Sequence, residues 1–456
     1  MAKKKKNLLA SSSPARIISI SFLLVILFGT FLLTLPAAAK NGMATPFIDA
    51  LFTATSATCV TGLIMYDTFT HWTVFGQTVI ICLIQIGGLG LVTFASFFNI
   101  IAGKKMGIRT MQIAKESVNT ENVADLYQMV RIVVSYSMFF ELIGAFLLAF
   151  AFVPKFGSYG IFMSVFIAIS AFCNAGFDLF GIIEPYSSLT TFTGSYWVTL
   201  VIAFLIIFGG LGFIVWNNIV QFKKTRKLYL QTKIVIAATA VLILLGTIGF
   251  LLLEWSNPQT MGNLSAGEKI MAAFFQSVTC RTAGFNSIEL TPLSGASKTL
   301  AILLMFIGVA PGSTGGGIKL TTIVVLFMTV VSMARGQNDA IIARRKISHL
   351  TVYKSMTILI CGILLVCFSS AVLLATTPLA ENGLTVIDAF FEAVSAFSTT
   401  GVTTGVTSLV TLPGKIILCL TMFFGRVGPV SFMLAVAHQT PLGRKEVIPD
   451  AKIMVG

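Results

Sequence analysis

Residues 52–62 read FTATSATCVTG, and this eleven-residue pattern returns three more times along the chain. The other copies are FIAISAFCNAG at 166–176, FFQSVTCRTAG at 274–284 and FEAVSAFSTTG at 391–401. Every copy has phenylalanine ten residues before its last glycine, and three copies carry Ser-Ala at the same place. The glycines lie 114, 108 and 117 residues apart, and self-similarity at a fixed period is a signal about the whole fold. The sequence therefore predicts four copies of one structural unit.

Each copy lies in or beside an apolar run that is too short to cross a bilayer. These runs cover 47–58, 161–172, 270–280 and 386–397. A spanning helix needs about 20 apolar residues, so runs of this length suit re-entrant helices. Eight longer runs flank them, and they are continuous rather than alternating, which favours helices over a barrel. The eight predicted spans are Ile17–Leu35, Val74–Ile101, Ile132–Val153, Tyr196–Val220, Ile234–Leu253, Thr299–Met333, Ser355–Leu374 and Ile416–His438.

The composition agrees with an integral membrane protein. Of 456 residues, 56% are hydrophobic and only 11% are charged, whereas a soluble domain carries about 25% charged residues. This excludes a soluble enzyme, a disordered protein and a disulfide scaffold. The prediction is an all-α polytopic membrane protein of one domain (1–456), with eight transmembrane helices and four re-entrant pore loops around one central pore. The predicted pseudo-repeats are about 17–101, 132–220, 234–333 and 355–438, with tails at 1–16 and 439–456.

The net charge of +14 predicts the orientation of the chain. The segments on the N-terminal side (1–16, 103–131, 221–233, 334–354 and 439–456) hold 23 of the 31 basic residues. The positive-inside rule then places both termini in the cytoplasm, so the basic excess does not indicate nucleic acid. Lys319 and Arg426 fall inside spans. The other six basic residues are assigned to the outer side: Lys40, Lys155, Lys269, Arg281, Lys298 and Lys415. The outer side is nevertheless slightly acidic in net charge and would attract cations.

Four glycine-bearing loops around one axis can point backbone carbonyls inward, where they replace the water shell of a monovalent cation. Glycine is required there because such a loop reaches φ values that a side chain disfavours. Taken singly, each glycine could instead serve close packing between helices. Four glycines at the same position of four repeats favour a selectivity filter. The candidate ion-binding residues are Val60, Thr61, Gly62, Asn174, Ala175, Gly176, Thr282, Ala283, Gly284, Thr399, Thr400 and Gly401.

These four copies resemble the Trk/Ktr/HKT superfamily of potassium transporters over nearly the whole chain. The stretch GSTGGGIK at 312–319 is similar to that of the Ktr-type membrane subunit. The resemblance implies channel-like potassium uptake across the cell membrane rather than catalysis, and a homodimer in which each protomer has its own pore. It also implies a cytoplasmic ring of nucleotide-binding regulatory subunits, with ATP or ADP sensed on the partner. No cofactor is expected on this chain; K⁺ is the expected cargo, and Na⁺ is a candidate activator.

The sixth predicted span is too long for one straight crossing and has PGSTGGGIK at its middle. Proline and glycine weaken a helix, so two helices joined by a loop are expected just below the filter. The family resemblance implies that this loop is an intramembrane gate, and a plain kink is the alternative. A phosphate-binding Walker loop is disfavoured because Ile318 separates the glycines from Lys319. The candidate gate residues are Gly312, Ser313, Thr314, Gly315, Gly316, Gly317 and Arg426.

Arg426 is expected to face the pore and pair with this loop, since a charge within a span is costly and usually faces a cavity or a partner. Snorkelling to an interface is the alternative for Arg426 and for Lys319. Glu392 is expected either to stabilise the N-terminus of the fourth short helix or to support the pore, and Glu141 needs a partner that the sequence does not name. A sodium-coupled or alternating-access transporter is the competing function; it predicts broken spans in corresponding halves, whereas here one broken span is expected.

Overall fold

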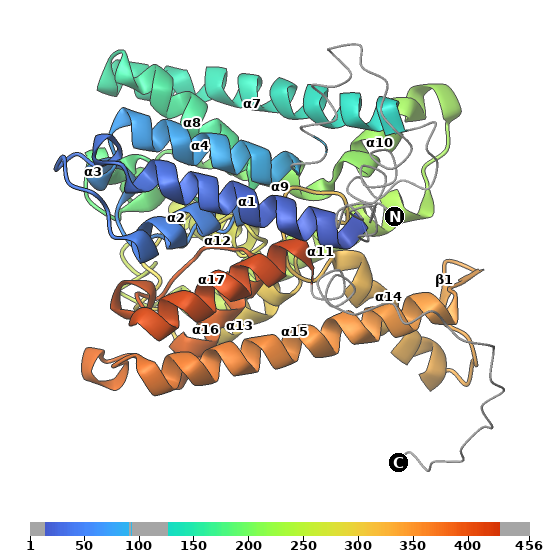
Figure 1. Cartoon of the computed structure of the whole chain (residues 1–456). Coiled ribbons are helices and arrows are strands. Elements are labelled where there is room, and N and C mark those ends of the chain that lie inside the picture. Colours follow the sequence, from blue (N-terminus) through green and yellow to red (C-terminus); the bar gives the residue numbers. More distant parts are fainter. Residues whose placement is uncertain (1–13, 91–92, 94–125, 429–456) are drawn as a thin grey trace, which may run out of the picture.

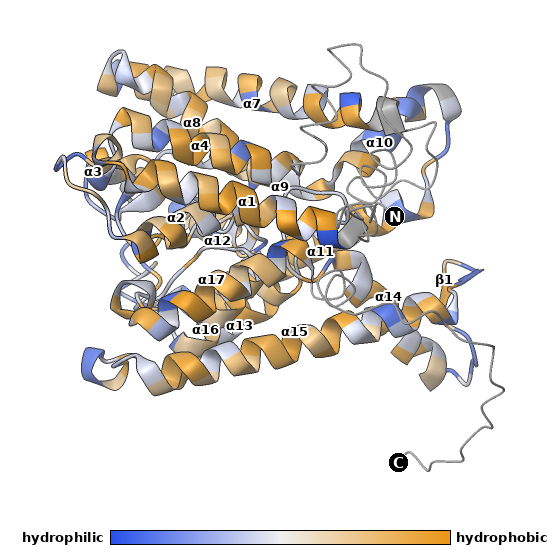
Figure 2. Ribbon diagram, in the orientation of Figure 1, coloured by the Kyte–Doolittle hydropathy of each residue, from blue (hydrophilic) through white to orange (hydrophobic). Residues whose placement is uncertain are grey.

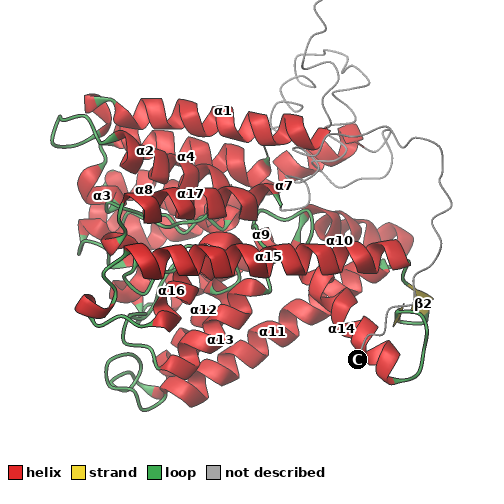
Figure 3. Ribbon diagram, turned by 60° about the horizontal axis from the view of Figure 1, so that its bottom comes forward, coloured by secondary structure: helices red, strands yellow, loops and turns green. Residues whose placement is uncertain are grey.

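The computed structural model describes residues 14–90, 93 and 126–428, and they form a helical bundle. The long helices run side by side along one direction, with shorter helices between them (Figure 1). The only strands in this described part are the two-residue β1 (Ile341–Ile342) and β2 (Arg345–Lys346), visible at the edge of Figure 3. The predicted all-α fold is therefore confirmed.

The helices follow the order expected from the repeated sequence pattern. Their bounds are α1 (Pro14–Thr34), α2 (Phe47–Cys59), α3 (Thr68–His71), α4 (Val74–Leu89), α7 (Leu126–Phe156), α8 (Tyr159–Cys173), α9 (Tyr196–Leu211), α10 (Phe213–Thr225), α11 (Leu230–Glu254), α12 (Ala266–Thr279), α13 (Gly295–Phe306), α14 (Leu320–Ala334), α15 (His349–Thr376), α16 (Val386–Ser398) and α17 (Leu412–Val427). The four short helices predicted from the repeat are α2, α8, α12 and α16.

Within the described residues, four helices are long and apolar enough to cross a membrane: α1, α7, α11 and α15. Of these, α1, α7 and α15 are coloured as apolar along most of their length (Figure 2). The helices α9 and α10, bent by 92° at the break between them, together are also long and apolar enough to form one broken span. The predicted spans Val74–Ile101 and Ile416–His438 correspond to α4 and α17 only in part, because 91–92, 94–101 and 429–438 lie outside the described residues. Residues 1–13 of the predicted N-terminal tail and all of the predicted C-terminal tail also lie outside them.

Two predicted spans are interrupted. The sixth consists of α13 and α14, joined by the non-helical segment Ile307–Lys319, which we call the α13–α14 loop. This confirms the expected break. The fourth was expected to be one helix, Tyr196–Val220, and that expectation is wrong, because α9 ends at Leu211 and α10 begins at Phe213. Gly212 has φ +87° between them, a conformation that a residue with a side chain rarely adopts.

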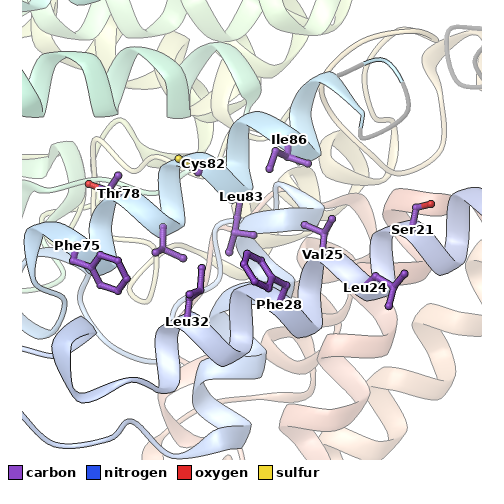
Figure 4. Close-up of a pocket in the computed structure, with 11 residues that line it drawn as sticks. Ser21, Leu24, Val25, Phe28, Leu32, Phe75, Thr78, Cys82, Leu83 and Ile86 are labelled. Carbon is purple, nitrogen blue, oxygen red and sulfur yellow. The ribbon is translucent and has the colours of Figure 1, made fainter. Parts of the chain in front are cut away.

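The short helices α2, α8 and α16 contact both spanning helices of their own repeat, α12 contacts α11 of its own, and every short helix contacts one helix of the neighbouring repeat. Thus α8 contacts α4, α12 contacts α9 and α16 contacts α13, while α2 contacts α17 and closes the circle. The outer faces of the long helices are apolar, as contact with hydrocarbon requires. Between α1 and α4 they leave a groove of about 430 Å³ that includes Leu24, Phe28, Phe75 and Leu83 (Figure 4).

Candidate ion-conducting site

Three of the four short helices end in the same way, because α2, α8 and α16 are each capped by a left-handed residue, whereas α12 is capped by Cys280 in a right-handed conformation. We call residues 60–62, 174–176, 282–284 and 399–401 the glycine segments. Their first residues all have left-handed backbone: φ is +59° at Val60, +61° at Asn174, +66° at Thr282 and +53° at Thr399. The glycine two residues later also has positive φ in every copy. A left-handed residue ends a helix, so the chain turns away from α2, α8 and α16 at this point, whereas in the third copy the left-handed Thr282 comes two residues after the cap of α12.

The glycine segments meet one another in a closed ring that follows the order of the sequence. A methyl group added at Gly62 would lie 2.6 Å from the carbonyl oxygen of Ala175, and one at Gly176 would lie 2.7 Å from the Cα of Gly284. One at Gly284 would lie 2.7 Å from the carbonyl oxygen of Thr400, and one at Gly401 would lie 2.7 Å from the Cα of Gly62. No side chain fits at these positions without displacing the neighbouring segment.

The side chains of the glycine segments are buried, and each non-glycine residue in them is fully covered. The first and fourth segments are held alike, because Gly62 N and Gly401 N each donate to a serine hydroxyl at 3.1 Å, on Ser56 and Ser395. In the second segment, Asn174 lies 3.3 Å from the Thr282 hydroxyl of the third. All twelve candidate filter residues are therefore brought together; ion binding by them stays a prediction.

A cavity of about 440 Å³ opens above the ring, and the four glycines form its floor. Three carboxylates line this outer mouth, on Asp67, Asp178 and Glu289, and the described lining includes no lysine or arginine. Burial raises the pKa of Asp178 to about 7, and the nearby Asp67 adds to the shift. Because cations are attracted to a concave surface of negative charge, the expected acidic mouth is present at the place where an ion would enter.

The α13–α14 loop lies directly beneath the ring and contacts three of the four glycine segments or their helices. The Thr314 hydroxyl donates to the carbonyl of Phe172 at the end of α8 (3.1 Å). The backbone N–H of Gly316 donates to the Thr399 hydroxyl (2.9 Å), and a methyl group at Gly315 would strike the Thr282 hydroxyl. The candidate gate residues Gly312–Gly317 thus lie where the sequence placed them, below the candidate filter.

The bend at Gly212 belongs to the same arrangement. Phe213 N, at the start of α10, donates to the carbonyl of Gly312 (2.9 Å), and Ala310 N donates to the carbonyl of Gly210 (3.1 Å). Since these bonds join the bend to the loop, the broken fourth span and the broken sixth span support each other. The sequence signal for this bend was Gly-Gly-Leu-Gly at 209–212, which also ends α4 at 87–90.

Arg426 extends from the last turn of α17 to the α13–α14 loop. Its guanidinium donates to the carbonyls of Thr314 and Gly87, and to that of Gly88 at 3.2 Å. It therefore contacts the loop, as expected, and does not snorkel to an interface. Lys319 also turns inward, and its ammonium donates to the carbonyl of Gly315 at 2.6 Å. These two cations hold carbonyls of the loop in place; their effect on ions stays a prediction.

Two buried carboxylates, Glu392 and Glu141, form hydrogen bonds close to the glycine segments. Glu392 accepts hydrogen bonds from the Thr403 hydroxyl (2.8 Å) and the Thr407 hydroxyl, so it ties α16 to the chain after the fourth glycine segment. It does not stabilise the helix N-terminus, because α16 begins at Val386 and Asp388 caps it. The partner of Glu141 is Gln85, whose amide donates to both carboxylate oxygens at 3.2 and 3.1 Å.

Arg281 was missed as a site residue, and its expected place on the outer side is wrong. Only 4% of it is exposed, and its guanidinium donates to the carbonyls of Thr239 (3.3 Å) and Gly308 (3.4 Å). Gly308 belongs to the α13–α14 loop. The physical reason is that the chain after a re-entrant helix is still at membrane depth, so a residue there is not on the outer surface.

Comparison with known proteins identifies the family of this chain. Residues 1–446 match the TrkH family model, described as cation transport protein. The Ktr system potassium uptake protein B of Bacillus subtilis is 38% identical over 445 residues, which cover 97% of each chain. The potassium/sodium uptake protein NtpJ of Enterococcus hirae is 38% identical over 457 residues, covering 99% of each.

A solved structure supports the fold. The crystal structure of the potassium transporter TrkH from Vibrio parahaemolyticus matches with a TM-score of 0.71 at 18% identity, covering 95% of this chain and 87% of that one. The fold, the full-length relatives and the family match agree over nearly the whole sequence. This chain therefore belongs to the TrkH family of cation transport proteins, multi-pass proteins of the membrane.

Proposed function

We propose that this chain is the membrane subunit of a potassium uptake system and conducts K⁺ inward along the axis of the ring. The relatives that match over full length are named for potassium uptake. In this proposal, carbonyls of the four glycine segments replace water around K⁺, as in other potassium filters. The observation that carries the proposal is the closed ring of glycine segments, with an acidic mouth above and the α13–α14 loop below.

In the same proposal the α13–α14 loop is the gate and Arg426 stabilises its closed form. The loop fills the space under the ring and is held there by hydrogen bonds to backbone and side chains of neighbouring repeats. The partly buried guanidinium of Arg426 under the ring also raises the electrostatic barrier to a cation. Opening requires these bonds to break, so removing part of the loop should raise conduction.

Reconstituted liposomes test the gate directly. ⁸⁶Rb⁺ and ²²Na⁺ uptake are measured for the wild-type chain and for a variant lacking Ser313–Gly315. We expect faster ⁸⁶Rb⁺ uptake in the deletion variant, since the ring remains and the obstacle is shortened. The control removes three exposed residues elsewhere, Gly336–Asn338 after α14, and should leave uptake unchanged. A folded deletion variant with unchanged or abolished uptake would contradict a gate, and equal ⁸⁶Rb⁺ and ²²Na⁺ uptake in the wild type would contradict a potassium filter.

We further propose a homodimer in the cell membrane with both termini in the cytoplasm, regulated by a ring of nucleotide-binding subunits. Basic segments support a docking face, because the end of α10 (Phe222–Lys227) and the β1–β2 hairpin with Arg344–Lys346 lie toward the same end of the molecule (Figure 1). The basic segment Lys104–Arg131 lies almost entirely outside the described residues. Replacing Arg344 and Arg345 with glutamate should weaken co-elution with the regulatory subunit; unchanged co-elution would remove the hairpin from the proposed contact.

A sodium-coupled, alternating-access transporter is the second candidate. The sequence predicted one broken span, whereas the structure has two, and their breaks are hydrogen-bonded to each other. This second break at Gly212 favours the alternating-access candidate. Uptake of ⁸⁶Rb⁺ that strictly requires a sodium gradient would support this candidate. Uptake that persists without sodium, driven only by the K⁺ gradient and voltage, supports the channel-like proposal. Sodium that accelerates such uptake without being required would be an activator.

A further inference from the structure

The third glycine segment is held differently from the other three. In the first, second and fourth, the residue before the glycine donates its N–H to a serine carbonyl five residues earlier: Thr61 to Ser56, Ala175 to Ser170 and Thr400 to Ser395, at 2.7–2.8 Å. In the third, Ala283 N donates instead to Thr279 O at 3.0 Å. The position of those serines is occupied by Val278, which has no hydroxyl to support the segment.

Arg281 precedes this segment directly and provides a different kind of support. One arm of its guanidinium donates to the carbonyl of Thr239 in α11, and the other donates to the carbonyl of Gly308. Gly308 lies two residues after the end of α13, where the α13–α14 loop begins, and its own N–H bonds to Ile318 O at the other end of the loop (3.0 Å). The Arg281 side chain thus joins the third glycine segment to the first end of the loop, which is itself hydrogen-bonded to the other end.

A buried guanidinium depends on its acceptors. Within the described residues Arg281 forms no ion pair with a carboxylate, and its Nε has no hydrogen-bond partner. Two backbone carbonyls therefore provide the hydrogen bonds seen for this charge. Burying a charge without acceptors is costly, so a movement of the loop that takes Gly308 away would destabilise Arg281 and loosen the segment attached to it.

We propose that Arg281 is a positioning residue that couples the α13–α14 loop to the third glycine segment. The inference rests on the proposed function, in which the loop is the gate and the ring is the filter. With the loop in place, Arg281 fixes the backbone of Thr282–Gly284 and the ring discriminates between cations. With the loop displaced, the guanidinium loses an acceptor and that quarter of the ring relaxes. Arg281 differs from Arg426, which contacts the middle of the loop from the fourth repeat.

The test combines Arg281→Gln with the deletion of Ser313–Gly315 in the liposome assay, without a regulatory subunit. In the full-length chain, Arg281→Gln should raise ⁸⁶Rb⁺ uptake and lower the ⁸⁶Rb⁺/²²Na⁺ uptake ratio, each by about tenfold, as expected for the loss of a hydrogen bond to a charged group. In the deletion background it should raise uptake no further, because the coupled element is gone. A merely structural role would reduce uptake in both backgrounds and leave the ratio unchanged.

Two further variants keep the result interpretable. Arg335→Gln, an exposed position at the end of α14, is the matched control and should change neither uptake nor ratio. If Arg281→Gln does not fold, Arg281→Lys keeps the charge but not the two-armed reach, and should change both readouts in the same direction. Equal, additive effects in both backgrounds or an unchanged ratio would overturn the coupling. Failure of the loop deletion alone to raise uptake would instead count against the proposed gate.

Discussion

Lys415 at the start of α17 and Asp49 at the start of α2 form an ion pair of 2.6 Å, although 366 residues separate them in the chain. A second pair, Lys298 to Asp388 at 2.7 Å, joins α13 to α16 in the same way. Asp49 and Asp388 both lie three residues before the phenylalanine that opens the repeated pattern. Each pair therefore fastens a short helix to the spanning helix of the preceding repeat, and the first one closes the circle.

Breaking one of these pairs should destabilise the protein strongly. Lys298→Met leaves Asp388 buried without its cation, and we expect a loss of about 3–5 kcal/mol in unfolding free energy. The double variant Lys298→Met with Asp388→Asn should recover part of that loss, because no unpaired charge remains. Thermal unfolding in detergent measures both. The control is Lys346→Met, whose pair with Asp339 is exposed, so its effect should stay within about 1 kcal/mol. Equal shifts for Lys298→Met and Lys346→Met would show that the buried pair contributes little.

Serine at a ring glycine should weaken discrimination between K⁺ and Na⁺. At Gly176 the new Cβ would meet Gly284 and the carbonyl of Ala283, and positive φ adds strain, so the ring must widen. We expect the ⁸⁶Rb⁺/²²Na⁺ uptake ratio to fall by about tenfold or more, since a loss of only about 1.4 kcal/mol in relative binding gives that change. Gly295→Ser is the control, because nothing lies within 4 Å of its Cβ position and its φ is ordinary. An unchanged ratio in a folded Gly176→Ser protein would rule out this glycine as part of the filter.

Removing the guanidinium at position 426 should open the path. Arg426→Ala leaves the carbonyl of Thr314 without its donor and removes a positive charge beneath the ring, so ⁸⁶Rb⁺ uptake should rise several-fold. In the Arg426→Lys variant ⁸⁶Rb⁺ uptake should rise less, because the positive charge remains while the two-armed contact of the guanidinium is lost. Uptake by both variants at the wild-type rate would mean that the contact with Thr314 does not limit conduction. Thermal unfolding of each variant separates a gating effect from a loss of folded protein.

The repeated pattern predicted the short helices closely because their length and their ending are local properties. The run 47–58 corresponds to Phe47–Cys59 and the run 386–397 to Val386–Ser398. An apolar run fixes where a helix can lie, and the small and polar residues before each glycine allow the left-handed turn that ends it. The loop in the sixth span was predictable for the same reason, since proline and four glycines within seven residues act locally.

The bend at Gly212 was not predicted, although Gly-Gly-Leu-Gly at 209–212 is a local signal for it. The run Tyr196–Val220 is apolar and contains no proline, so its periodicity and length indicate one helix. The helix is broken by hydrogen bonds to Gly312 and Ala310, which lie about a hundred residues further along the chain. The position of Arg281 was predicted wrongly for a related reason. Assigning each basic residue to one side of the membrane assumes that every segment between spans reaches water. A re-entrant segment turns back inside the membrane, and only the three-dimensional structure shows how far.

Asp178 is the carboxylate of the outer mouth with the clearest dependence on pH. It lies two residues after the ring glycine Gly176, and it accepts a hydrogen bond from Phe180 N at 3.0 Å. Burial raises its pKa to about 7, and its hydrogen bonds only partly oppose that shift. Asp67 accepts hydrogen bonds from the backbone N–H groups of Phe69, Thr70 and Tyr186, and it lines the same cavity above the ring as Asp178.

Uptake should therefore depend on external pH through Asp178. A raised carboxyl pKa means that the neutral form prevails below about pH 7 and the anion above it, so attraction for cations is present at high pH and is lost as the pH falls. We expect ⁸⁶Rb⁺ uptake to fall as the external pH decreases from 8 to 6, and Asp178→Asn to hold it at the low-pH value throughout. Glu289→Gln, an exposed carboxylate of the same mouth, is the matched control and should keep the midpoint near pH 7. A midpoint that persists in Asp178→Asn would assign the titration to another group.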